Sequence, residues 1–242
     1  MADASYPEQW ANRECVHNYL EIADIMVVGR RKSLDILKSF YRHFLMGQKP
    51  NTILDLGCGD GILTHELIQV DDSISAVLVD GSEDMLEKAR ERLADFKQCQ
   101  FINASFQELM SEKVELPVCS FAISSLALHH LTSSEKTSFF KYIYSHLADG
   151  GYFLNIDVVR SAAPAIEKWH MELWLEGILE QQPPPGFEEI FEDTVNTYKK
   201  DDHYSKVDPL ESQMASLAEA GFKEVDCYHK QGMFAMYGGR KY

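Results

Sequence analysis

Residues 52–61 read T-I-L-D-L-G-C-G-D-G, and this stretch decides the fold. Its first half, Thr52–Leu56, is a short apolar run of the kind that forms a buried strand. Three glycines then alternate at Gly57, Gly59 and Gly61, directly before a helical pattern. Glycine permits a positive φ and close approach of the backbone to a ligand, and a helix N-terminus offers free N–H groups. We therefore expect an anionic or strongly polar ligand at this turn.

The spacing of the glycines separates two classes of nucleotide site. The dinucleotide fingerprint G-x-G-x-x-G would need a glycine at position 62, where this chain has Ile62, so the pattern counts against NAD. The next apolar run, 76–79, is followed by Asp80, where a carboxylate can accept hydrogen bonds from both hydroxyls of a ribose. The glycine turn and the strand-ending acid together indicate a nucleoside pocket.

The same alternation of strands and helices continues along the chain. Further elements are expected in this order: a helix at 83–96, strands at 99–103 and 119–124, a helix at 134–147, a turn at Asp149-Gly150-Gly151, a strand at 152–157, a helix at 209–220, and strands near 223–229 and 231–238. Alternating strands and helices form parallel sheets, and the final pair reads as an antiparallel hairpin. The predicted fold is an α/β, doubly wound, mostly parallel seven-stranded sheet, Rossmann-like, with an antiparallel C-terminal hairpin.

Two segments fall outside this alternation, although residues 1–242 are expected to form one domain. Residues 8–46 read as helical, and we expect the segment 1–48 to lie over the ligand site. Residues 160–208 read as an inserted helical lid that contains the turn Pro183-Pro184-Pro185-Gly186. The aromatic and imidazole residues of this insert could exclude water and select an apolar or cationic ligand; they are Trp169, His170, Trp174 and Tyr204. If removal of residues 165–205 left the choice of ligand and the turnover unchanged, the lid hypothesis would be wrong.

Composition limits the partners. The chain carries 38 acidic and 23 basic residues, a formal net charge of −15, which disfavours nucleic acid and anionic membranes. Five cysteines are widely spaced without C-x-x-C pairs, so neither a disulfide framework nor a metal site is indicated. No secretory leader or long apolar run is seen, so we expect a cytoplasmic protein.

At this point the residues from about Asn51 to Asp157, with a looser match from Leu210 to the end, resemble the class I S-adenosylmethionine-dependent methyltransferases. The resemblance implies S-adenosyl-L-methionine as cofactor and a small-molecule methyl acceptor. It also implies that the glycine loop holds the methionine part and that Asp80 binds the ribose. The cofactor-binding residues expected on this basis are Arg30, Asp55, Gly57, Cys58, Gly59, Gly61, Asp80, Gly81, Met85, Ser105, Phe106, Ser124, Ser125 and Leu126.

The third motif departs from the family pattern. Members often carry an acid after the third strand, where this chain reads Asn103-Ala104-Ser105-Phe106. Ser105 occupies the position that often hydrogen-bonds the adenine amine, and a hydroxyl is a weaker partner than a carboxylate. By the same resemblance, Ser124, Ser125 and Leu126 would line the reacting centre.

In methyl transfer from a sulfonium the cofactor already carries the activated group. The protein therefore mainly has to position the reactants and exclude water, and acid–base catalysis is needed only for some acceptors. If the acceptor is a hydroxyl, a thiol or a carbon acid, a residue near the methyl group could take its proton. The candidates are His130, Asp157 and His129, with His170 as a further possibility from the insert. A structural role stays open for each of them.

Three functions fit the sequence. The first is a methyltransferase acting on a small molecule. The second is a protein that binds S-adenosylmethionine without chemistry, which the Ser105 departure keeps open. The third is an enzyme similar to the synthases of carboxy-S-adenosylmethionine, which tend to have Ser where this chain has Gly59.

Overall fold

The structure is a computed structural model that describes residues 20, 22–183, 187, 191–192, 194–196 and 206–242. Its centre is a seven-stranded sheet in the order β3-β2-β1-β4-β5-β7-β6. The strands are β1 Thr52–Leu56, β2 Ser75–Asp80, β3 Cys99–Asn103, β4 Cys119–Ser125, β5 Leu147–Val158, β6 Lys223–Gln231 and β7 Phe234–Arg240. The first five strands are parallel, and β7 runs antiparallel to both β5 and β6. The predicted doubly wound sheet with its antiparallel hairpin is confirmed.

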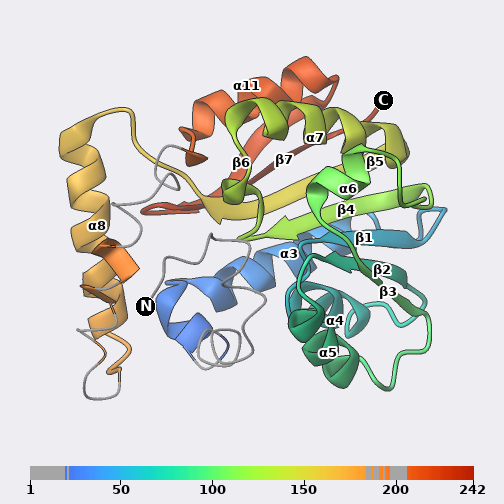
Figure 1. Ribbon diagram of the computed structural model, residues 1–242, viewed down its shortest axis with the longest axis horizontal. Coiled ribbons are helices and arrows are strands. Elements are labelled where there is room, and N and C mark those ends of the chain that lie inside the picture. Colours follow the sequence, from blue (N-terminus) through green and yellow to red (C-terminus); the bar gives the residue numbers. More distant parts are fainter. Residues whose placement is uncertain (1–19, 21, 184–186, 188–190, 193, 197–205) are drawn as a thin grey trace.

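Helices cover both faces of this sheet (Figure 1). They are α3 Arg30–Phe44, α4 Ile62–Ile68, α5 Glu83–Arg92, α6 Phe106–Met110, the 3-10 turn η1 Leu128–His130, α7 Ser133–His146, α8 Pro164–Leu179 and α11 Leu210–Ala220. One core packs α3, α4 and α5 under the sheet, and a second packs α6, α7 and α11 over it. Alternate residues of β1 divide between the two: Ile53 enters the first core and Leu54 the second, as expected of a strand buried on both faces.

Several boundaries differ from the sequence-based expectation, and four of the differences have a local cause. The N-terminal helical stretch is broken at Gly29, whose φ of 79° lies in the left-handed region. Helix α5 ends at Arg92 because buried Leu93 leaves helical geometry. The expected turn at 149–151 belongs to β5, since the N–H of Gly150 donates to the carbonyl of Lys241 and thereby joins the sheet. The final strand begins at Phe234 because the hairpin turns at Gly232, with φ 57°.

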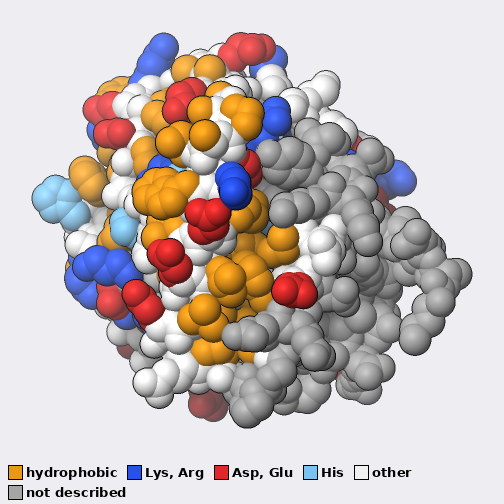
Figure 2. Space-filling model, turned by 90° about the vertical axis from the view of Figure 1, so that its left-hand side faces the viewer, with side chains coloured by type: hydrophobic (Ala, Val, Ile, Leu, Met, Phe, Trp, Pro, Cys, Tyr) orange, Lys and Arg blue, Asp and Glu red, His pale blue; other side chains and the backbone are white. Residues whose placement is uncertain are grey.

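Helix α8 stands beside the sheet, beyond the ends of β5 and β7 (Figure 1). A third apolar cluster joins it to the chain before α3 and to the strand ends, through Trp174, Met26, Val158 and Phe234. Its outer face keeps large apolar side chains exposed, among them Ile166, Trp169 and Leu179. Figure 2 shows hydrophobic side chains interspersed with acidic ones on this face. Pro184–Gly186 and Tyr204 of the predicted insert lie outside the described residues.

Candidate functional site

The sheet order reverses between β1 and β4. Chain connections leave these two neighbours in opposite directions: β1 continues into the β2 side of the sheet, and β4 into the β5 side. In open α/β sheets, ligands bind beyond the carboxyl ends of the strands at such a reversal. The glycine turn after β1 and the segment after β4 therefore occupy the position of a ligand site.

Each glycine of the turn has a different reason to lack a side chain. All three have positive φ: 70° at Gly57, 53° at Gly59 and 75° at Gly61. A Cβ on Gly57 would lie 2.4 Å from the Cβ of Ala127, and one on Gly61 would press into the packing against α5. A Cβ on Gly59 would meet only the Met85 sulfur, at 4.0 Å. The backbone at Gly59 therefore borders open space that a ligand could fill.

Asp80 ties this turn to the second strand. One carboxylate oxygen accepts the N–H of Gly59 and the other accepts the N–H of Ser82, each at 2.8 Å. Burial raises the pKa of Asp80, while these two hydrogen bonds act in the opposite direction. Each oxygen keeps a second lone pair, so the carboxylate can still accept hydrogen bonds from ribose hydroxyls.

Asp55 holds a buried acceptor without a donor. Its Oδ2 accepts the hydroxyl of Thr64 at 2.7 Å, and its Oδ1 has no hydrogen-bond partner among the described residues. Burial raises the pKa of this carboxyl to about 7, with smaller contributions from Asp80 and Asp60. Cys58 is buried beside it, and burial raises the pKa of its thiol, so it is not a reactive thiolate.

The expected adenine side is formed by α5 and α6. Met85 is buried and faces Gly59, while Gly81 approaches the backbone of Ser105, whose Cα would lie 3.9 Å from an added Cβ. Ser105 caps α6: its hydroxyl donates to the Glu108 carboxylate at 2.9 Å and accepts the Glu108 N–H at 3.2 Å. This capping box explains why a serine follows β3 where the family often has an acid.

The segment after β4 lies across the turn from these residues. Phe106 of α6 packs toward Gly57, and the Ser124 hydroxyl donates to the carbonyl of Leu56 at 2.7 Å, which joins β4 to β1. Ser125 is half-buried. Leu126 has a φ of 50°, and its N–H donates to the carbonyl of Ile156 at 2.9 Å. A left-handed leucine costs about 1–2 kcal/mol, so the surrounding contacts hold the chain in this bend.

His129 and Asp157 are brought together at this edge of the sheet. The carboxylate of Asp157 accepts the backbone N–H of His129 at 3.0 Å, and its other oxygen lies 2.6 Å from the ring Nδ1. Because a carboxylate can only accept, this contact selects the tautomer with the proton on Nδ1 and leaves Nε2 as an acceptor. Asp157 is 1% exposed, whereas the His129 side chain is 15% exposed. His130 stacks edge-on against His129, with ring centroids 3.8 Å apart.

A buried polar chain continues behind Asp157 that the sequence did not reveal. The Asn155 amide donates to the Tyr237 hydroxyl at 2.7 Å and to Asp157 at 3.4 Å. Tyr237 donates in turn to the Gln213 side chain. Tyr237 and Gln213 come from the last strand and from α11, so no local pattern could have linked them to Asp157.

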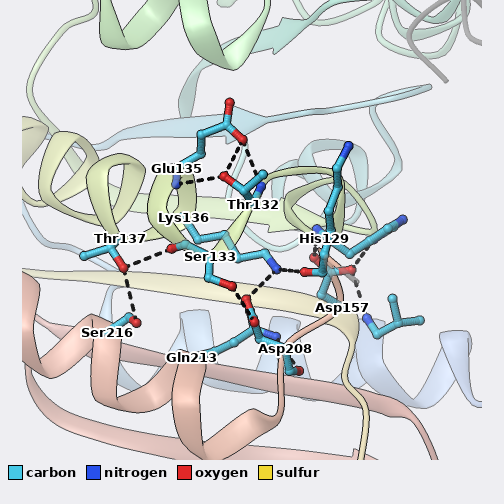
Figure 3. Close-up of polar contacts among 12 residues, drawn as sticks. His129, Thr132, Ser133, Glu135, Lys136, Thr137, Asp157, Asp208, Gln213 and Ser216 are labelled. Carbon is cyan, nitrogen blue, oxygen red and sulfur yellow. Dashed lines mark hydrogen bonds and ion pairs between the residues drawn. The ribbon is translucent and has the colours of Figure 1, made fainter. Parts of the chain in front are cut away.

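Figure 3 shows a second group of polar contacts beside this one. Lys136, 2% exposed, donates to the Asp208 carboxylate at 2.9 Å and to the carbonyl of Lys206. Ser133 donates to the same carboxylate at 2.7 Å. These contacts fix the chain that returns from the insert onto α7.

Arg30, expected at the carboxylate of the cofactor, has a different partner in the structure. Its Nη1 lies 2.6 Å from Asp24, and Arg31 shares the same carboxylate at 3.0 Å. The ion pair uses one nitrogen of the Arg30 guanidinium, and the other N–H groups could still donate to a ligand. Within the described ranges, no cluster of three or more His, Cys, Asp or Glu residues is placed to hold a metal ion. The described helices include none long and apolar enough to cross a bilayer.

The comparisons with known proteins agree with this geometry. A family described as "Methyltransferase domain" matches residues 53–151. The chain is 29% identical over 194 residues to the carboxy-S-adenosyl-L-methionine synthase of Helicobacter pylori strain G27, covering 78% of this chain and 75% of the relative.

Solved structures share the fold at lower identity. An O-methyltransferase family protein from Burkholderia thailandensis superposes with a TM-score of 0.64 at 11% identity, over 95% of this chain and 59% of its own. Human N-acetylserotonin methyltransferase in complex with SAM gives 0.51 at 16%, over 99% of this chain and 68% of its own. The chain thus spans about three fifths of the Burkholderia protein.

Proposed function

We propose that this chain, which has the class I S-adenosylmethionine-dependent methyltransferase fold, binds S-adenosyl-L-methionine and transfers its methyl group to a small acceptor molecule. The observation that carries the proposal is the turn at Gly59. Its backbone borders open space, and its N–H is held by the carboxylate expected to bind the ribose.

The residues at the turn fit this cofactor. Asp80 keeps lone pairs for the ribose hydroxyls, and Met85 offers an apolar surface beside Gly59 for the base. We propose as further contacts of the cofactor Gly57, Cys58, Gly61, Gly81, Ser105, Phe106, Ser124, Ser125 and Leu126, together with Arg30.

When bound, the sulfonium would supply an already activated methyl group. The chain's own task is then to orient the acceptor, exclude water and, for an acidic acceptor, hold its proton. His129 is the best-placed base: Asp157 fixes its ring and leaves Nε2 free to accept a proton. We assign His130 no chemical step and Asp157 the role of positioning His129.

A synthase of carboxy-S-adenosylmethionine is the second candidate. The 29% identity to the Helicobacter pylori synthase over most of both chains supports it, and Gly59, where those synthases tend to have Ser, speaks for the methyltransferase. The third candidate is a protein that binds S-adenosylmethionine without chemistry.

The domain and lid assignments are part of the same proposal. Residues 1–242 would form one cytoplasmic domain, with 1–48 over the cofactor site and 160–208 as a lid. The helix α8 and its contact with Met26 support a lid that meets the N-terminal segment beside the site.

The test begins with calorimetric titration of the full chain with S-adenosylmethionine and S-adenosylhomocysteine, with NAD as the control. We expect micromolar binding of the first two and none of NAD; failure of both sulfur nucleosides to bind would overturn the proposal. Radiolabelled methyl transfer to an acceptor library then separates an enzyme from a binding protein. A mass spectrum of the nucleoside retained after purification identifies a synthase if that nucleoside carries an additional carboxyl group.

A further inference from the structure

A small, partly open cavity lies between α8, the β6–β7 turn and the chain before α3, with the exposed Glu176 and Glu180 among its lining residues. Its volume is about 80 Å³. One face of α8 supplies His170, Trp174 and Gly177, spaced so that they align along the helix. Gly177 allows the close approach, since a Cβ there would lie 2.7 Å from a methyl carbon of Val28. The cavity is therefore built by packing of the insert against the core.

His170 lines this cavity with its imidazole ring. The residue is 7% exposed, and its Nδ1 has no hydrogen-bond partner among the described residues. Burial lowers the pKa of His170, as does the charge of nearby Lys230, while Glu167 acts in the opposite direction. A neutral imidazole has one acceptor nitrogen, and Nε2 is the ring nitrogen that a ligand's N–H group could reach, because Nδ1 is fully buried.

Trp174 provides the aromatic wall. Its indole N–H is already used, since it donates to the carbonyl of Met26 at 2.6 Å. Because this donor is occupied, a ligand in the cavity meets the carbon surface of Trp174. The ring also packs edge-on against Phe234, with centroids 6.1 Å apart. An indole face attracts cations within about 6 Å.

The charges of the cavity wall have one sign. Glu176 and Glu180 line it, and the lining residues include no lysine or arginine. Lys230 is the nearby cation, and its ammonium donates to the carbonyl of Gly232 at 2.5 Å. Two carboxylates, an imidazole acceptor and an indole ring together form a set that recognises an ammonium group.

We propose that this cavity binds the ammonium end of a small aliphatic amine. Resting on the proposed function, this amine is the end of the acceptor remote from the methylated atom. Phe234 of the cavity wall pairs with Val158, the last residue of β5, so the cavity adjoins the end of the strand that carries Asp157. Since a cavity of about 150 Å³ holds benzene, one of about 80 Å³ suits an amine of a few carbons.

The direct test uses the full chain without cofactor and three probes of similar shape: propylammonium chloride, propanol and sodium propionate. Nuclear magnetic resonance follows the Trp174 indole N–H and the His170 ring during titration. We expect saturable shifts with propylammonium, at least tenfold weaker binding of propanol and none of propionate. Equal binding of propylammonium and propanol, or no saturable shift with any probe, would overturn the ammonium site.

Variants of the cavity residues test which side chains bind the ammonium group. The double change Glu176→Gln and Glu180→Gln should weaken propylammonium binding at least tenfold, as should His170→Phe. Glu172→Gln removes an exposed carboxylate from the same helix, away from the cavity wall, and should leave binding unchanged. If the double variant binds propylammonium like the unmodified chain, the assignment fails.

A separate experiment tests the link to methyl transfer. Paired acceptors, each a primary amine and its N-acetyl derivative, are compared in the radiolabel assay, with propylammonium added as a competitor. We expect the amines to be preferred at least tenfold, and propylammonium to raise their KM without changing the affinity for S-adenosylmethionine. Equal use of both members would disprove the acceptor role. Propylammonium binding in a chain that binds no S-adenosylmethionine would instead disprove the proposed function and keep the ammonium site.

Discussion

Asp157 holds His129 twice, by its backbone N–H at 3.0 Å and by its ring Nδ1 at 2.6 Å. Both contacts cross from β5 to the 3-10 turn after β4, so one carboxylate fixes the position and the tautomer of the imidazole. A base in this arrangement depends on the negative charge and the acceptor-only character of Asp157.

The change Asp157→Asn should therefore lower kcat for a hydroxyl or thiol acceptor by about 10²–10⁴-fold. Asparagine keeps the size of the side chain but allows the opposite histidine tautomer. Binding of S-adenosylmethionine, measured by calorimetry, should change less than about twofold, since the lost interaction is with the base. Asp149→Asn, an exposed carboxylate near the other end of β5, serves as the control. A loss of kcat below tenfold would show that His129 is not the base.

Asp80→Asn tests the ribose assignment. Loss of the charge should weaken binding of S-adenosylhomocysteine by about 1–3 kcal/mol in a calorimetric titration, because charge-assisted hydrogen bonds are replaced by neutral ones. Asp95→Asn, exposed after α5, should leave the affinity as it is. Unchanged affinity of the Asp80 variant would remove this residue from the nucleoside site.

The glycines of the turn should respond differently to a methyl group. Gly57→Ala should lower the free energy of unfolding by about 3 kcal/mol or more, because a left-handed alanine is strained and its Cβ overlaps that of Ala127. Gly59→Ala should lower the free energy of unfolding by only about 1–2 kcal/mol, the cost of a left-handed backbone at an alanine, since its Cβ enters open space. Urea denaturation of both variants measures the difference. Equal losses would mean that the space beside Gly59 is filled in solution.

Lys136 provides a test of the contacts beneath the insert. Lys136→Met should destabilise the chain by about 2–4 kcal/mol, because it leaves the Asp208 carboxylate and the Lys206 carbonyl without their buried donor. Lys141→Met, on the same helix, breaks only an exposed pair with Glu219 and should cost less than about 1 kcal/mol. Thermal unfolding of the two variants provides the comparison, and similar melting temperatures would contradict a structural role for Lys136.

The raised pKa of Asp55 predicts a pH dependence of stability in the cofactor-free chain. Burial places this pKa at about 7 in the folded state, against about 3.9 in an unfolded chain. Between these values the folded state binds more proton, so the contribution of Asp55 to the free energy of unfolding falls as pH rises, by at most about 1.4 kcal/mol per pH unit. Asp55→Asn should remove this contribution to the pH dependence of the free energy of unfolding. Relative to the unmodified chain, the variant should therefore be more stable at pH 8 than at pH 5. If the free energies of unfolding of the two chains, measured by urea denaturation, changed with pH in the same way from pH 4 to 8, the prediction would be wrong.

Local patterns predicted most of the fold because their causes are local. The strands Thr52–Leu56 and Cys99–Asn103 were placed correctly to the residue, since each is a short apolar or β-prone run between turn signals. The strand at the expected 149–151 turn was missed because Gly150 pairs with the chain terminus at Lys241, a contact between distant residues.

In the candidate site, too, some residues could be predicted from local sequence and others depend on tertiary packing. The glycine turn and Asp80 could be predicted, since a φ requirement and a strand end are visible in sequence. The choice of His129 over His130 as the partner of Asp157 could not, because it depends on how the chain bends at the left-handed Leu126. The Tyr237–Gln213 contact and the partner of Arg30 likewise depend on tertiary packing.

The two ends of the insert meet in the structure. Arg160 forms a bridge with Pro209, and its N–H donates to the carbonyl of Asp208 at 3.4 Å. A segment whose ends already touch can be shortened, lengthened or exchanged without separating the strands that it connects, because loop closure depends only weakly on length. The length of the chain between Arg160 and Asp208 can therefore vary where the packing of α8 on Met26 and Phe234 is kept. Under the proposed function, exchange of this region at these two residues would change the choice of acceptor and leave the glycine turn and Asp80 as they are.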